Sequence, residues 1–293
     1  MRSFTLYHLY GRSFAFQQEK LVPIIVETAK PDIIFLLGGS LYRRRSESIF
    51  CPTAPSSLHT SDYFLLVLLN DLSRYELHEW QDKIERHCKA IMPITCIVLQ
   101  TSTFTEWLKA GDGFANTVRS SGALIYSRGN LELPDTVETN NLMRGKELEL
   151  QYRDGLNKAK EFMAGAELFK VRQQNRMAAF MLHQSSEQAL RTLIRIGTGF
   201  RSCTHNIGRL IRYASLVAYE LPDIFSHKDD RNIHLFNLLQ KAYIEGRYNE
   251  NYKISNSDLL DLTDRVSRIN GLLATKGEGI LGSSTGAIQP FTQ

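Results

Sequence analysis

The chain has 293 residues, of which 43% are hydrophobic and 23% are charged, and its formal net charge is +4. This composition excludes a wholly disordered chain and allows one large or two ordinary domains. No run approaches the roughly 18 apolar residues of a membrane span, and no basic-then-apolar leader follows Met1. Four cysteines without CxxC spacing argue against a structural zinc site. We therefore expect a cytoplasmic protein without a membrane partner; its mild basicity permits a nucleotide or RNA.

The first part of the chain alternates between helical and strand patterns. Apolar or β-branched runs predict strands, and segments of helical period lie between them. The predicted strands cover residues 33–37, 64–69, 94–99 and 123–126, and the predicted helices cover 17–30, 74–89, 103–110 and 114–121. This alternation predicts a mixed α/β domain over residues 1–130.

From residue 131 the pattern changes. Pro134, Asp135 and Thr139 to Asn141 indicate a linker over residues 131–150. Every later segment has helical periodicity, which predicts an antiparallel helical bundle over residues 151–275. The glycine- and serine-rich residues 276–293 are predicted to form a flexible tail. The expected fold class is therefore α+β with two domains: a mixed α/β domain followed by an all-α bundle.

A short loop in the first domain has half of the pattern of a phosphate and metal site. The segment 31–37, which contains the predicted strand 33–37, runs into Gly38-Gly39-Ser40, and Asp62 opens the next strand. A glycine turn lets backbone N–H groups approach phosphates, and two carboxylates at i and i+2 of a strand could hold two metal ions. Here the second position is Phe64, and the strand 94–99 contains no carboxylate. Gly38-Gly39-Ser40 could also be simply a tight turn, and Asp62 a strand-start residue.

These residues resemble the minimal nucleotidyltransferase family, with the DNA polymerase β and kanamycin nucleotidyltransferase fold, over roughly residues 15–130. The resemblance implies that Gly39 and Ser40 lie at the nucleotide phosphates and that Asp62 is a remnant metal ligand. Mg²⁺ would be bound together with a nucleotide only if the first domain still binds nucleotides. Arg43, in the run Arg43 to Arg45, is a candidate phosphate or RNA contact, although such runs are often solvated surface. With the metal ligands incomplete, we expect an inactive domain, with residual nucleotidyl transfer as an alternative.

The helical half contains four pieces that, in this order, resemble the HEPN (higher eukaryotes and prokaryotes nucleotide-binding) family. They are the segment 181–190 with Gln184 and Glu187, the helix end at 198–200, the segment 203–207 with His205, and the segment 242–248. The resemblance implies a bundle of five helices that often forms a homodimer. It also implies that active members are metal-independent RNases, which use an Arg and a His from each protomer.

The candidate catalytic pair is Arg231 and His234, although only two residues separate them and the family uses four to six. His205 is expected to hydrogen-bond a neighbouring helix. Arg247 and Tyr248 are predicted either to bond adjacent carbonyls or to reach a nucleotide phosphate.

We therefore expect a protein that binds a nucleotide or RNA, in a regulatory or defence setting like that of toxin–antitoxin pairs. The ligand would lie in the helical cleft, at the Gly-Ser loop or where the domains meet. The alternatives are a dimeric metal-independent RNase and a residual nucleotidyltransferase.

Overall fold

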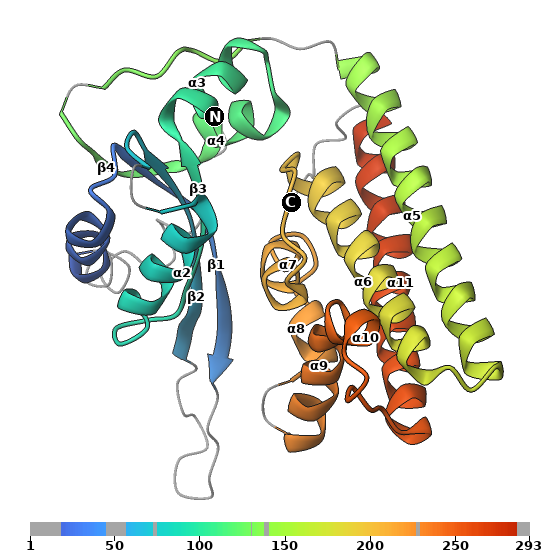
Figure 1. Cartoon of the computed structure of the whole chain (residues 1–293). Coiled ribbons are helices and arrows are strands. Elements are labelled where there is room, and N and C mark those ends of the chain that lie inside the picture. Colours follow the sequence, from blue (N-terminus) through green and yellow to red (C-terminus); the bar gives the residue numbers. More distant parts are fainter. Residues whose placement is uncertain are drawn as a thin grey trace, which may run out of the picture. The chain divides into compact units, whose positions relative to one another are not determined.

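The computed structural model describes residues 19–44, 57–72, 75–129, 131–137, 141–226 and 229–285 (Figure 1). The chain divides into two compact units, residues 1–138 and 139–293. A mixed α/β unit precedes a helical unit, which confirms the predicted fold class. No described helix has both the length and the hydrophobicity to cross a membrane.

The first unit contains a four-stranded sheet in the order β3-β2-β1-β4. The strands are β1 (Ile33–Arg44), β2 (Ser57–Leu69), β3 (Ile94–Gln100) and β4 (Ala123–Ser127). β1 pairs antiparallel with β2 and β4, whereas β2 and β3 are parallel. β1 and β2 are the longest strands and form a hairpin that extends past the other two (Figure 1). β3 is buried along nearly its whole length, as its mostly apolar and β-branched sequence predicts.

Helices cover both faces of this sheet. A helix over residues 19–29 and α2 (Leu77–Cys88) pack on one face, where Ile25 and Ile84 meet Leu36, Leu65 and other apolar side chains. α3 (Thr101–Lys109) and α4 (Gly113–Ser121) follow β3, and Phe104 of α3 contacts Phe35 of β1 with ring centroids 6.2 Å apart. The sheet is therefore the middle layer of three.

The expected turn at Gly38-Gly39-Ser40 is wrong, because these residues lie inside β1. Gly38, Gly39 and Ser40 pair with Phe64, Tyr63 and Asp62 of β2. The ladder shifts register between Leu36 and Gly38 and again between Ser40 and Leu41, as at β-bulges, which glycine accommodates readily. The strand continues because β2 begins at Ser57, earlier than predicted, and supplies partners for it.

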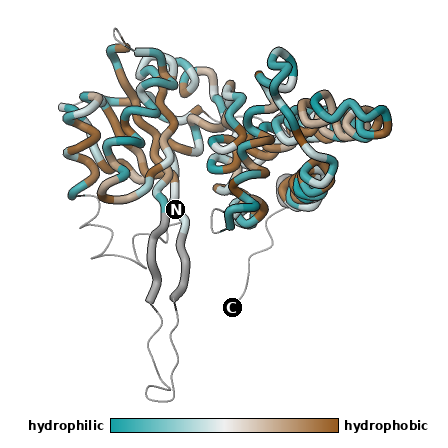
Figure 2. The backbone as a smooth tube through the Cα atoms, turned by 60° about the horizontal axis from the view of Figure 1, so that its bottom comes forward, coloured by the Kyte–Doolittle hydropathy of each residue, from teal (hydrophilic) through white to brown (hydrophobic). Residues whose placement is uncertain are grey.

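The helical unit is built around three long helices, α5 (Asn141–Val171), α6 (Asn175–Thr198) and α11 (Asn256–Thr285), which lie side by side in Figure 1. Shorter helices complete it: α7 (Ile207–Ala214), α8 (Leu221–Ile224), α9 (Asp230–Ala242) and α10 (Glu245–Tyr248). α6 packs against α5, α7, α9, α10 and α11 and is the central helix. Hydrophobic and hydrophilic positions alternate along the helices, as amphipathic packing requires (Figure 2).

Both ends of the helical unit are longer than predicted. α5 begins at Asn141, inside the predicted linker. Side-chain contacts between residues one helical turn apart support its first half, such as the hydrogen bond of 2.7 Å from Gln151 to Glu147. α11 continues to Thr285, so residues 276–285 are helical where composition predicted a tail. Packing overrides the weak helix propensity of glycine there, since a Cβ on Gly277 would lie 2.2 Å from the Tyr152 ring.

Candidate functional site

In the first unit, the structure brings Ser40 and Asp62 together as opposite residues of the β1–β2 ladder. Gly39 pairs with Tyr63 beside them. Asp62 is half-buried, and its Oδ2 accepts a hydrogen bond of 2.9 Å from the Thr95 hydroxyl on β3. The backbone of Arg43 pairs with Leu58, while its side chain lies outside the described part of the structure.

This arrangement does not fit a two-metal centre. Phe64, two residues after Asp62, is buried and pairs with Gly38 and Thr95. The second ligand position is therefore an aromatic ring, and β3, where a third acid would be expected, presents the Thr95 hydroxyl beside it. Across the described residues, no group of three or more His, Cys, Asp or Glu side chains is placed to hold a metal ion. A role for Asp62 in the hydrogen bonding of the sheet accounts for its observed contact.

In the helical unit, Arg231 and His234 lie together at the start of α9, and both face acids of α11. The Arg231 guanidinium pairs with Asp258 and, at 2.6 Å, with Asp261. His234 Nε2 is 3.5 Å from the other Asp258 carboxylate oxygen. The hydrogen bonds to Asp261 and Asp258 raise the pKa of Arg231. Burial raises the pKa of Asp258, but hydrogen bonds from Ser255, Arg231 and His234 lower it by more, so its pKa is below the ordinary value. An anion near this pair would meet two carboxylates.

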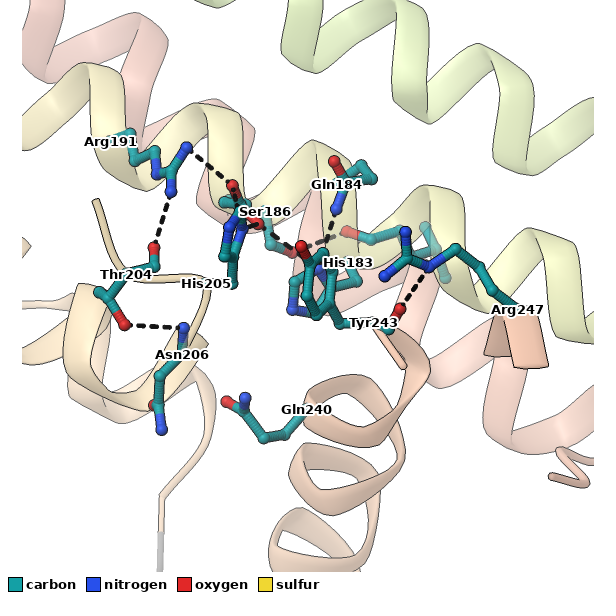
Figure 3. A network of polar contacts seen from close by, with 12 residues as sticks. His183, Gln184, Ser186, Arg191, Thr204, His205, Asn206, Gln240, Tyr243 and Arg247 are labelled. Atoms are coloured by element: carbon teal, nitrogen blue, oxygen red, sulfur yellow. Dashed lines mark hydrogen bonds and ion pairs between the residues drawn. The ribbon is translucent and has the colours of Figure 1, made fainter. Parts of the chain in front are cut away.

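A different polar network crosses the middle of α6 (Figure 3). Glu187 is almost fully buried, and both of its carboxylate oxygens lie within 3.1 Å of His205 Nδ1. Arg191, one turn further along α6, pairs with the same carboxylate at 2.9 Å. Arg191 also donates to the carbonyls of Cys203 and Thr204, each at 3.0 Å. His205 therefore bonds the neighbouring helix as predicted, and Arg191 ties its loop to α6.

Aromatic stacking extends this network. The Tyr243 ring stacks on His205, with centroids 4.5 Å apart and planes 14° apart, and lies 5.1 Å from the ring of His183 (Figure 3). His183 is fully buried, whereas about half of the His205 side chain is exposed. Burial, together with nearby positive charge on Arg247 and Arg191, lowers the pKa of His183 to about 4. His183 is therefore a neutral packing residue near pH 7, while His205 faces solvent.

Arg247 lies among three aromatic rings at the far end of the network. Its guanidinium carbon is 4.5 Å from the centroid of Tyr243, 4.9 Å from that of Tyr248 and 5.1 Å from that of Phe180. Its Nε donates to the Tyr243 carbonyl at 2.7 Å, which is one of the two roles predicted from the sequence. Tyr248 is 75% exposed.

At the other end, Arg191 lines a pocket of about 370 Å³ between α5, α6 and the loop after α6. Four cationic side chains surround it, Lys158, Arg191, Arg195 and Arg201, together with Gln151 and Gln188. Asp154 is the one carboxylate among the described lining residues, and it pairs with Lys158 at 2.7 Å. Such a pocket is suited to an anion with several oxygens.

This basic pocket was not predicted from the sequence. Arg191 and Arg195 follow Glu187 and Gln188 at helical spacing, which was a usable signal for one charged face. Lys158 and Arg201 come from α5 and from the loop, and only tertiary packing brings them to the same pocket.

The HEPN domain family model matches residues 152–275. We call residues 152–275 the HEPN segment. It contains the His205 network, the aromatic rings around Arg247, the Arg231–His234 pair and all of the residues that line the basic pocket except Gln151. The match agrees with the resemblance predicted for the helical half. No curated protein matches the chain.

Proposed function

We propose that the HEPN segment binds the phosphates of a nucleotide or RNA in the basic pocket, and that the first unit is a degenerate nucleotidyltransferase-like domain. The observation that carries this proposal is the gathering of Lys158, Arg191, Arg195 and Arg201 around one pocket. Neighbouring acids neutralise only part of this charge. Asp154 pairs with Lys158, Glu187 pairs with both Arg191 and His205, and Glu147 lies 3.9 Å from Arg195 and 4.0 Å from Arg201, so these three carboxylates face four cations and the half-exposed His205. The HEPN match supports a nucleotide- or RNA-related role.

Binding is tested by titrating the full chain with ATP, GTP and short RNAs in EDTA. We expect binding without a metal ion, and we expect it to weaken with salt by about 0.7 log units per tenfold rise in salt for each contacted phosphate. Lys158→Ala and Arg201→Ala should each weaken binding several-fold, because both side chains are largely exposed and their loss should spare the fold.

Matched controls are Lys160→Ala and Arg172→Ala, which remove exposed cations of the same helical unit that do not line the pocket. Equal losses in pocket and control variants would indicate nonspecific attraction and would overturn the assignment.

A second candidate function is metal-independent RNA cleavage. The observation that favours it is the hydrogen bond from His205 Nδ1 to buried Glu187, which orients the half-exposed imidazole as a proton donor or acceptor. The sequence-based alternative uses Arg231 and His234, but Asp258 and Asp261 disfavour a phosphate there. In EDTA, RNA cleavage lost in His205→Ala and retained in His234→Ala would support the His205 centre. The reverse pattern would support the original pair.

Residual nucleotidyl transfer through Asp62 is the remaining alternative, and the contact with Thr95 and the ring of Phe64 disfavour it. Mg²⁺-dependent incorporation of labelled ATP into an acceptor, lost in Asp62→Asn, would support residual nucleotidyl transfer. The regulatory or defence setting, like that of toxin–antitoxin pairs, and the homodimer through the HEPN segment remain part of the proposal. Light scattering during size-exclusion chromatography tests the dimer.

A further inference from the structure

Between Ala178 and Ile196, α6 is buried except at Met181 and along one stripe. Its side chains are mostly packed inside the bundle, yet a partly exposed residue recurs every three or four positions at Phe180, Gln184, Gln188, Arg191 and Arg195. At 1.5 Å per residue, this stripe is about 22 Å long. The structure therefore presents one narrow surface along the central helix.

The two ends of the stripe have different chemistry. Arg191 and Arg195 belong to the basic pocket, where phosphate oxygens would be held. Phe180, at the other end, contacts Arg247, whose guanidinium also lies against Tyr248. Tyr248 is 75% exposed and lies beside Ile244, which is 63% exposed. That end therefore offers an aromatic and apolar surface.

The middle of the stripe connects these ends without a gap in contacts. Arg191 shares Glu187 with His205, His205 stacks on Tyr243, and the Tyr243 ring lies against Arg247 (Figure 3). Glu187 is buried and already paired, so the exposed chemistry of the middle is amide and imidazole. Alternating cations, amides and aromatic rings are typical of surfaces that follow a single strand.

We propose that the stripe along α6 binds a single-stranded RNA oligonucleotide, with phosphates in the basic pocket at one end and an unpaired base stacked on Tyr248 at the other. The inference rests on the proposed function and extends it, because a mononucleotide in a 370 Å³ pocket would not reach the aromatic end. A stripe of about 22 Å spans at most about six nucleotides at the 3.4 Å spacing of one duplex strand, and fewer where the strand is extended.

The test measures the affinity of the full chain for 5′-labelled single-stranded RNAs of two, four, six, eight and ten nucleotides in EDTA. We expect affinity to rise steeply up to about six nucleotides and then to level off. A fully paired duplex of eight base pairs should bind more weakly than the single strand, because its bases cannot stack on a protein ring. Affinity that does not depend on length, or equal binding of the duplex, would overturn the inference.

Substitutions at Tyr248 test the aromatic end. Tyr248→Ala should weaken binding of the eight-nucleotide RNA by roughly tenfold, the size of one lost base-stacking contact, and should leave the dinucleotide unaffected. Tyr248→Phe should retain binding. Tyr219→Ala is the matched control, because Tyr219 is 78% exposed and lies outside the stripe. An equal effect of the two alanine variants would contradict the stacking role.

The two proposals fail in different ways. If the dinucleotide and the long RNA bind equally and only the pocket variants weaken them, the pocket assignment stands and the extended site is wrong. If no RNA or nucleotide binds at any length, the proposed function fails and this inference fails with it.

Discussion

Glu187 and His205 lie 18 positions apart in sequence and are joined by a contact of 3.0 Å between a carboxylate oxygen and Nδ1. The carboxylate is 2% exposed and the imidazole 49% exposed. Arg191 shares the carboxylate, and its other hydrogen bonds hold the loop that carries His205. One buried acid therefore fixes the position of a solvent-facing histidine and of a pocket arginine at the same time.

Glu187→Gln should destabilise the helical unit by about 1–3 kcal/mol, because the neutral amide replaces an acceptor of two charge-assisted contacts in a buried place. It should also weaken nucleotide binding, since Arg191 loses the partner that orients it. Urea unfolding measures the first effect and titration the second. Glu161→Gln, an exposed residue of α5, is the control. A Glu187→Gln variant as stable as its control would contradict the role assigned to this carboxylate.

The stability of the helical unit should fall as the pH is lowered from about 6.5 to about 4. The pKa of buried His183 is lowered to about 4 from an ordinary value of 6.5. Between these values the unfolded chain binds a proton that the folded chain excludes, so unfolding becomes easier as the pH falls. The total loss is about 3 kcal/mol at most.

The measurement is the urea midpoint at several pH values, with His183→Asn as the comparison. The variant should be less stable near pH 7, and its midpoint should depend less on pH between 6.5 and 4. If the two proteins show the same pH dependence, protonation of His183 is not its cause.

Much of the fold could be predicted because its signals are local. The β-branched run at 94–99 predicted a strand that the structure places at Ile94–Gln100, and the helical stripes predicted the long helices. The predicted turn at Gly38 failed because a distant strand, β2, supplies partners that extend β1 through the glycines. The predicted tail at 276 failed because Gly277 admits the ring of Tyr152 from another helix.

The candidate site was less predictable, since its chemistry depends on which helices pack together. Glu187 and His205 belong to the segments that resemble the HEPN family, and the predicted contact of His205 with a neighbouring helix is confirmed. Lys158 meets Arg191 only because α5 lies against α6, which no local pattern reveals. Arg231 and His234 form an Arg–His pair in the sequence, yet the acids that face them come from α11, which a local motif does not reveal.

Thr95→Val should destabilise the first unit by about 1–2 kcal/mol. Thr95 is 1% exposed and donates a 2.9 Å hydrogen bond to Asp62. Valine keeps the shape of the side chain but cannot donate this hydrogen bond, so the half-buried Asp62 carboxylate loses a partner. Thr95→Ser retains the hydroxyl and should keep more of the stability that the hydrogen bond provides. Guanidinium unfolding of the full chain, followed by tryptophan fluorescence from Trp80 and Trp107, measures the difference. A valine variant as stable as the wild type would show that Asp62 does not depend on this hydroxyl.

Gly155→Ala should destabilise the helical unit by about 1–3 kcal/mol, although alanine favours a helix. Gly155 lines the basic pocket where α5 crosses α6, and a Cβ there would lie 1.9 Å from Thr192 Oγ1. The helices would have to separate, which should also weaken nucleotide binding by displacing Lys158. Gly145→Ala in the same helix is the matched control, because a Cβ at that position meets nothing within 4 Å. It should be neutral or stabilising by up to about 1 kcal/mol. Thermal unfolding measures both variants, and Thr192→Ala should restore part of the stability that Gly155→Ala loses. If the double variant regains nothing, the close approach of α5 and α6 is not the cause.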